Sequence, residues 1–221
     1  MAIPVLGYWD IRGLAEPIRL MLEYAGVKFE DKRYVCGDGP TYDRSEWLNV
    51  KPKMDLDFPN LPYFLDGDVK LVESFAIMKY IARKHNVLVP VKDQHLCDMM
   101  EGVVSDFRKS FTNLCYSSQY EALVEKYFED MATKLEKFEN YLLKHEWLGG
   151  DDLTYVDFAF AEILNQMVMM RPSLLDKHKK VGDYLKKFDS LKPIAAYRSS
   201  DRFRRFPCNN KMAKWGGQHE K

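Results

Sequence analysis

The sequence predicts an α+β domain followed by an all-α helical-bundle domain, and three observations support this prediction. Strand and helix signals alternate over residues 1–86. Over residues 92–221 the pattern is almost entirely helical, with apolar stripes among charged positions. The short segment 87–91 contains Pro90 and marks the linker. We therefore expect two domains, 1–86 and 92–221.

The first domain is predicted to begin with a strand, a helix and a second strand. Residues 3–9 have the apolar run of a buried strand, and Gly13 ends it. Apolar positions recur near helical spacing in residues 14–27, and residues 28–35 give a second strand. A glycine- and proline-marked loop follows, and residues 45–50 predict a short helical turn.

A hairpin and a helix are predicted to complete this domain. In LPYFLDGDVKLVES, two short apolar strands flank Asp66-Gly67, a favoured tight turn. Residues 74–85 predict an amphipathic helix with Ser74 at its N-cap. The resulting order, βαβαββα, implies a small mixed sheet with helices on its faces. It is also the thioredoxin-like order, in which Pro62 would precede the third strand.

The second domain is predicted to be a bundle of helices. Residues 92–116 and 119–143 carry the apolar stripes of antiparallel bundle helices. After the turn LGGDD, Thr154 and Asp157 form a capping box, which is a strong signal for the start of a helix.

The C-terminal run 197–217 mixes basic and aromatic residues, which alone could bind single-stranded nucleic acid. We favour a tail that wraps back over the domain, with Trp215 as its anchor, because no nucleic-acid motif accompanies the run.

Composition and cysteine usage indicate a cytoplasmic protein without nucleic-acid or membrane partners. Apolar residues make up 46% of the chain, and 33 basic residues balance 33 acidic ones, so no overall field attracts polyanions. The start MAIPVLGYWD lacks the features of a signal peptide, and no stretch approaches the roughly 20 apolar residues of a membrane span. The cysteines form no Cys-x-x-Cys pair, and we expect free thiols at Cys36, Cys97, Cys115 and Cys208.

Several classes of chemistry lack their sequence signature. The five histidines form no pair at helical spacing, so we expect no metal site. The chain has no Gly-x-Ser-x-Gly elbow, which argues against a serine hydrolase. It has neither a Walker loop nor Gly-x-Gly-x-x-Gly, so nucleotide binding has no support.

Polar and aromatic side chains gather at the predicted edge of the sheet. Tyr8 ends the first strand, and its hydroxyl could be either a satisfied core group or a ligand contact. Ser74 starts a helix whose free N–H groups could hold a carboxylate, although most such serines only cap. The extended backbone beside Pro62 could pair with a peptide. Together with Trp47 and Lys51, this combination suits a small anionic peptide.

Long contiguous motifs over nearly the whole chain resemble those of one family. They are GYWDIRGLAEPIRL, YDRSEWLN, LDFPNLPY, ESFAIMKYIARKH, LTYVDF and KMAKW. These motifs resemble those of the cytosolic glutathione S-transferases, and GDGPTYDRSEW resembles the loop that distinguishes the mu class. The resemblance implies a thioredoxin-like domain that binds glutathione and a helical domain that completes the pocket for an electrophile.

The resemblance implies that Tyr8 is the catalytic residue. Thiols titrate near ~8.5, and a hydrogen bond to the thiolate of glutathione would lower that pKa. The expected reaction is conjugation of this thiolate to hydrophobic electrophiles, with glutathione as cosubstrate and no prosthetic group. The alternative is a non-catalytic carrier of hydrophobic ligands or a structural relative without activity.

The resemblance also implies binding residues and a homodimer. Glutathione would be held by a set that includes one residue from the partner subunit: Tyr8, Trp9, Arg44, Trp47, Lys51, Asn60, Leu61 beside a cis Pro62, Glu73, Ser74 and, from the partner, Asp106. The electrophile would meet Ile11, Leu14, Thr112, Tyr116 and Asn209. Phe58 would insert into the partner subunit.

Four residues depart from the family pattern. Glu73 stands where mu-class chains usually have glutamine, and Pro52 replaces a usual phenylalanine. Thr112 and Asn209 fall where apolar side chains are common, which suggests a more polar electrophile pocket.

Overall fold

The computed structural model describes residues 3–90 and 92–218. By their contacts these residues form two compact units, and each is described by itself. One unit contains the residues up to His85 and those from Tyr197 onward, and the other contains Asn86–Ala196. This grouping differs from the predicted boundaries because the C-terminal tail (residues 199–218) belongs by contact to the first unit.

The first unit is built on a mixed sheet of four strands in the order β2-β1-β3-β4. The strands are β1 (Val5–Trp9), β2 (Glu30–Tyr34), β3 (Tyr63–Asp66) and β4 (Val69–Val72). β1 pairs with β2 in parallel, whereas the pairs β1–β3 and β3–β4 are antiparallel. The structure therefore has the small mixed sheet that the alternation of strand and helix signals predicts.

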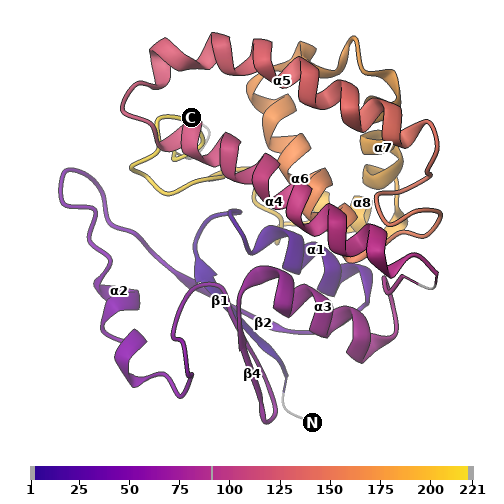
Figure 1. Cartoon of the computed structure of the whole chain (residues 1–221). Helices are drawn as coiled ribbons and strands as arrows, with labels where there is room; N and C mark the ends of the chain where they lie inside the picture. The colour runs from indigo at the N-terminus through magenta and orange to yellow at the C-terminus, as the bar shows by residue number, and fades with distance from the viewer. Residues whose placement is uncertain (1–2, 91, 219–221) are drawn as a thin grey trace. The chain divides into compact units, whose positions relative to one another are not determined.

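Two helices cover one face of this sheet. α1 (Glu16–Tyr24) connects β1 to β2, and α3 (Ser74–His85) follows β4. They lie side by side in Figure 1 and contact each other. Their buried apolar side chains, among them Ile18 and Ile77, form the core beneath the sheet.

Two predicted positions differ by one residue from the structure. Asp66 pairs with Val69, so the hairpin turn consists of Gly67 and Asp68. Ser74 is the first helical residue rather than the N-cap, because the carbonyl of Glu73 accepts the first helical hydrogen bond from Ile77, at 3.0 Å. The pairing of β3 with β4 sets the position of the turn. The start of α3 is set by Glu73, which has φ +70° and whose carbonyl accepts the first helical hydrogen bond.

The short helix α2 (Ser45–Leu48) is anchored to the sheet by aromatic side chains. The ring of Trp47 lies 5.3 Å from that of Tyr34 and 6.0 Å from that of Tyr63, and the hydroxyls of both tyrosines are 2.9 Å apart. A side chain on Gly7 would lie 2.1 Å from the Tyr63 ring. Glycine in the middle of β1 is therefore what allows the aromatic cluster to form.

The second unit is a bundle around one buried helix (Figure 1). Its long helices are α4 (Gln94–Tyr116), α5 (Tyr120–Leu142), α6 (Tyr155–Met170) and α7 (Lys179–Asp189). Two short helices follow α6 and α7: η2 (Pro172–Leu175) and α8 (Lys192–Arg198), whose last two residues belong to the first unit. The short η1 (Lys51–Lys53) follows α2 in the first unit. α4 and α7 pack against α6, which is buried along most of its length. Within this core, the rings of Phe138 and Phe160 stack at 4.2 Å.

The start of α6 has the capping box that the sequence predicts. The buried carboxylate of Asp157 accepts hydrogen bonds from the backbone N–H of Thr154 at 2.9 Å and of Leu148 at 2.8 Å. The hydroxyls of Thr154 and Tyr184 donate to it as well, each at 3.0 Å. Burial nevertheless raises the pKa of Asp157 to about 6.

Candidate functional site

The site is built around Tyr8, at the end of β1. The side chain is only 7% exposed, and its hydroxyl oxygen accepts a hydrogen bond from the backbone N–H of Leu14 at 3.2 Å. Among the described residues, no acceptor takes the hydrogen of this hydroxyl. The phenol is thus held at the corner between β1 and α1 with one donor still available.

The corner can hold this hydroxyl because residue 13 is glycine. Gly13 has φ +45°, a conformation that other residues rarely adopt. A Cβ there would lie 2.8 Å from the hydroxyl oxygen of Tyr8, 2.6 Å from its ring and 3.1 Å from the side chain of Ile11. Gly13 therefore leaves the space in which the Tyr8 hydroxyl and Ile11 lie.

The C-terminal tail and a buried arginine fix the backbone of this corner. The N–H groups of Arg12 and Gly13 donate to the carbonyls of Pro207 and Cys208, at 2.9 and 3.1 Å. Arg19 is fully buried and donates to the carbonyl of Ile11 at 2.9 Å. The loop after Tyr8 is thus bonded on both sides.

The charge of Arg19 is balanced by two carboxylates. It forms ion pairs with Glu16 and Asp31, both at 3.0 Å, and the hydroxyl of Tyr197 donates to Glu16 at 3.0 Å. Burial opposes the charged form of Arg19, but the neighbouring carboxylates raise its pKa above the ordinary value. The guanidinium therefore stays charged inside the first unit.

Asp10, two residues after Tyr8, joins the sheet to the tail. Its carboxylate accepts hydrogen bonds from Arg33 on β2, at 3.1 Å, and from Arg204 in the tail. Burial disfavours its ionisation, but the two arginines outweigh that effect and lower the pKa of Asp10. Asp10 is therefore ionised and fully paired.

Strand register brings several of the predicted glutathione-binding residues to the same end of the sheet as Tyr8. Gly7 pairs with Tyr63, and Tyr63 pairs with Val72. Leu61, two residues before the start of β3, and Glu73, which directly follows β4, therefore lie at the end of the sheet where Tyr8 and Trp9 lie. The Leu61–Pro62 peptide is cis, as the resemblance implies.

The turn into α3 is strained at this end of the sheet. Glu73 has φ +70° although it is not glycine, and its side chain is exposed. Residues held in this conformation cluster at functional sites, because the surrounding structure must stabilise them. Ser74 follows as the first residue of α3 and is half-buried.

Four further side chains have polar groups that are available for a ligand. Trp47 is buried, but its indole N–H makes no hydrogen bond with the described residues. Arg44 precedes α2 and Lys51 begins η1, and neither forms an ion pair within the described chain. Asn60 is exposed beside Leu61.

The structure does not bring all predicted site residues together in one unit. Asp106, Thr112 and Tyr116 lie on α4 in the second unit. Asn209 belongs to the first unit and is buried, with its amide donating to the carbonyl of Trp215 at 3.1 Å. That hydrogen bond, together with the contact between the Trp215 and Phe206 rings, shows how the tail is anchored.

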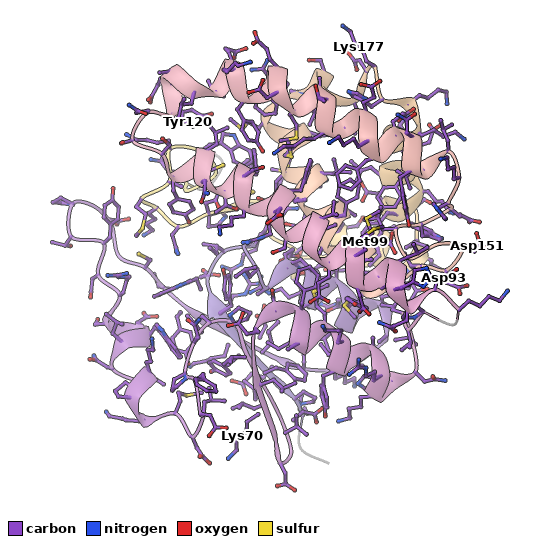
Figure 2. The ribbon with its side chains drawn as sticks, in the orientation of Figure 1. Lys70, Asp93, Met99, Tyr120, Asp151 and Lys177 are labelled. Atoms are coloured by element: carbon purple, nitrogen blue, oxygen red, sulfur yellow. The ribbon has the colours of Figure 1, made fainter. Side chains whose placement is uncertain are left out.

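Outside this end of the sheet, charged side chains form surface ion pairs. One example is Lys70, which lies on β4 near the hairpin in Figure 2 and pairs with Asp55. In the part of the chain that the structure describes, no cluster of side chains could hold a metal ion, and no helix is long and apolar enough to cross a membrane. All four cysteines are buried free thiols.

Sequence reasoning missed two residues that support the corner. The sequence marks Gly13 only as the end of a strand, because its contact with Tyr8 depends on the shape of the turn. Arg19 could have been found from the sequence, since it lies three residues after Glu16 among the apolar positions of α1. Two charged residues on the buried face of a helix indicate an internal ion pair.

Comparison with known proteins places this sequence and this fold in one class of protein. Residues 4–83 match the family described as "Glutathione S-transferase, N-terminal domain", and residues 105–201 match "Glutathione S-transferase, C-terminal domain". The crystal structure of the glutathione S-transferase Blo t 8 is similar, with a TM-score of 0.86 and 36% identity over 96% of this chain and 99% of that one. The chain therefore belongs to the glutathione S-transferase family, and the predicted fold class is confirmed.

Similarity to individual relatives identifies the class within the family. The chain is 47% identical to glutathione S-transferase Mu 5 of Mus musculus and 48% identical to glutathione S-transferase Mu 3 of Homo sapiens. Each comparison spans 215 residues, 97% of this chain and 96% of the relative. The protein is a mu-class member, a transferase that joins glutathione, its cosubstrate, to electrophilic small molecules.

Proposed function

We propose that Tyr8 stabilises the thiolate of glutathione in this transferase. The observation that carries the proposal is the hydrogen bond from Leu14 to the Tyr8 oxygen. Because the oxygen accepts there, its own hydrogen is free to donate to a sulfur. A donor aimed at a thiolate favours the charged form and increases the fraction of the strong nucleophile at neutral pH. Tyr8 forms no covalent intermediate in this proposal.

The remainder of glutathione is proposed to lie across the same end of the sheet. The backbone of Leu61 pairs with the cysteinyl unit, as an added strand would. The γ-glutamyl end meets Asn60, Glu73 and Ser74, where the N-terminus of α3 favours a carboxylate. The glycyl end meets Trp9, Arg44, Trp47 and Lys51, and the unpaired cations and the free indole N–H support this assignment.

The electrophile is proposed to contact Ile11, Leu14, Thr112, Tyr116 and Asn209. Ile11 supports this assignment, because its side chain and the Tyr8 hydroxyl both lie close to the position that a Cβ on Gly13 would occupy. Tyr116 would act as an acid towards epoxide-like substrates. The carrier without catalysis is not favoured, since the corner presents a tyrosine hydroxyl with a free donor.

Conjugation of glutathione to a chloronitrobenzene tests the role of Tyr8. We expect Tyr8→Phe to lower kcat about a hundredfold, the usual cost of one lost donor at a developing charge, with glutathione binding mostly retained. Tyr80→Phe is the matched control, because it removes a hydroxyl that is bonded to Asp66 at the other end of β3. Equal activity of Tyr8→Phe and wild type would overturn the proposal.

We further propose a homodimer in the cytoplasm, without nucleic-acid or membrane partners. Phe58 is 79% exposed, which is unusual for a large apolar side chain. The second unit has a mainly apolar pocket between α4 and α5, lined by Met100, Phe107 and Phe138, with Asp106 at its side. Phe58 of one copy would fill this pocket in the other.

The mass in solution tests this dimer. Phe58→Ser is expected to weaken association, whereas the control Leu143→Ser, which replaces a 61% exposed leucine, leaves it unchanged. An unchanged dissociation constant for Phe58→Ser would rule out the assignment of Phe58.

A further inference from the structure

A cavity of about 440 Å³ lies within the first unit, between the loop 35–42 and the C-terminal tail. Apolar side chains from both segments line it, including Val35 and Pro207. Ile11 and Asn209 also line it, so it is continuous with residues that we propose for the electrophile. The cavity is large enough for a small aromatic molecule with a substituent.

The cavity adjoins the Tyr8 corner through Ile11. The side chain of Ile11 and the Tyr8 hydroxyl both lie close to the same point, the place of a Cβ on Gly13. An electrophile whose reacting carbon lies near the sulfur held by Tyr8 can therefore direct its other end past Ile11 into the cavity. The charged and polar groups in the cavity wall then determine which substituents are favoured at that other end of the electrophile.

Charges in the cavity wall are not equivalent. Asp10 is already paired with Arg33 and Arg204, so it offers little attraction to a cation. Lys211 in the tail is paired with Asp38 of the loop at 2.6 Å. The Lys211 side chain is 34% exposed, whereas that of Asp38 is 88% exposed. Both residues line the cavity, but the lysine side chain is the more buried of the two, and the carboxylate lies mostly in water.

The ion pair between Lys211 and Asp38 is readily exchanged. Pairs with so exposed a partner contribute little to stability, because water and salt screen them. A carboxylate brought into the cavity by a bound electrophile would meet Lys211 on its less exposed side, where the interaction is stronger. A cationic ligand would instead be repelled by Lys211.

We propose that Lys211 is a specificity-determining residue, which favours electrophiles that carry an anionic group at the end away from the reacting carbon. The proposal rests on the electrophile site proposed above. Asp38 weakens this preference for anionic electrophiles, because its carboxylate competes with the ligand for Lys211. Neither residue takes part in the formation of the thioether.

Matched electrophiles test the proposal on the full-length enzyme. Chlorodinitrobenzoate and chlorodinitrobenzamide share a reacting carbon and differ in charge. We expect Lys211→Gln to raise KM for the benzoate about threefold to fivefold and to change KM for the benzamide by less than twofold. Asp38→Asn is expected to lower KM for the benzoate. Lys214→Gln, an exposed lysine outside the cavity wall, should change neither value.

Binding without turnover separates this inference from the proposed function. Calorimetry with unreactive dinitrobenzoate and glutathione-bound enzyme should show the same weakening in Lys211→Gln, and thermal unfolding checks that the variants are folded. If the wild type turns over neither electrophile, the proposed function fails, and calorimetry still decides the role of Lys211. Equal effects of Lys211→Gln on benzoate and benzamide, or no effect on either, would overturn the inference.

Discussion

Two corners that lead into helices use their polar groups in opposite ways. At the start of α6, the buried carboxylate of Asp157 accepts hydrogen bonds from the backbone of Leu148 and Thr154 and from two hydroxyls. At the turn before α1, the hydroxyl of Tyr8 accepts a single bond, from Leu14, and its hydrogen has no acceptor among the described residues. The corner at α6 thus satisfies its buried group, whereas the corner for which we propose ligand binding keeps a donor available.

The largest expected effect comes from removing the hydrogen-bonded carboxylate at the start of α6. Asp157→Ala leaves buried N–H and hydroxyl donors without an acceptor, so we expect it to lower the free energy of unfolding by about 3–5 kcal/mol. Asp183→Ala is the control, because this exposed carboxylate only pairs with Lys179 on the surface. Urea unfolding measures both. A loss below 1 kcal/mol for Asp157→Ala would contradict the comparison.

The pH dependence of stability tests whether burial or hydrogen bonding dominates at Asp157. The pKa of Asp157 is about 6 in the folded protein, against an ordinary value of 3.8, so the folded state binds the proton more tightly. The free energy of unfolding should therefore fall as the pH rises from about 4 to about 6, by about 2 kcal/mol relative to that of Asp157→Asn. A difference between the two proteins that rises over this range would show that hydrogen bonding outweighs burial.

At the other corner we expect a loss of activity rather than a large loss of stability. Gly13→Ala places a methyl group against the Tyr8 ring and hydroxyl, and the displacement should lower kcat about tenfold to a hundredfold. Gly26→Ala is the matched control, because Gly26 has φ +66° but nothing within 4 Å of its Cβ position. Both variants should lose about 1–2 kcal/mol of stability from backbone strain. Similar kcat values for the two would show that the contact with Tyr8 does not matter.

The smallest expected effect concerns the support of the Tyr8 corner. Tyr197→Phe removes one hydrogen bond to Glu16, whose carboxylate still pairs with Arg19. We expect a loss of about 1 kcal/mol in unfolding free energy and kcat within a factor of two of wild type. A tenfold fall in kcat would show that Tyr197 positions the loop rather than only stabilising it.

Local signals predicted much of the fold. The capping box of Thr154 and Asp157 is complete within four residues, so its position in the sequence is also its position in the structure. The Asp66-Gly67 turn and the Ser74 cap were each predicted one residue away from the observed feature. Pairing between β3 and β4 decides the position of the turn, and the backbone conformation of Glu73 after β4 decides the start of α3. The preference of a single residue contains neither piece of information.

The site was predictable where a residue ends an element and not where it depends on distant contacts. Tyr8 could be placed at a strand end from the apolar run before it. The internal pair of Arg19 and Glu16 could also be found, from its spacing in α1, but its partner Tyr197 could not, because Tyr197 lies 181 residues from Glu16 in the sequence. The role of Asp10 likewise depends on Arg204, in a tail whose contacts no local pattern reveals.

The attachment of the tail to the Tyr8 corner has a consequence for the order of synthesis. Arg12 donates to the carbonyl of Arg205, 193 residues later, and the neighbouring N–H groups donate to Pro207 and Cys208. Chains on the ribosome fold from the N-terminus as they emerge. The strands and helices of the first unit emerge early, but the loop beside Tyr8 lacks these partners until residues 205–208 have been translated. A truncated nascent chain therefore has an incompletely bonded loop beside Tyr8, where we propose that glutathione binds.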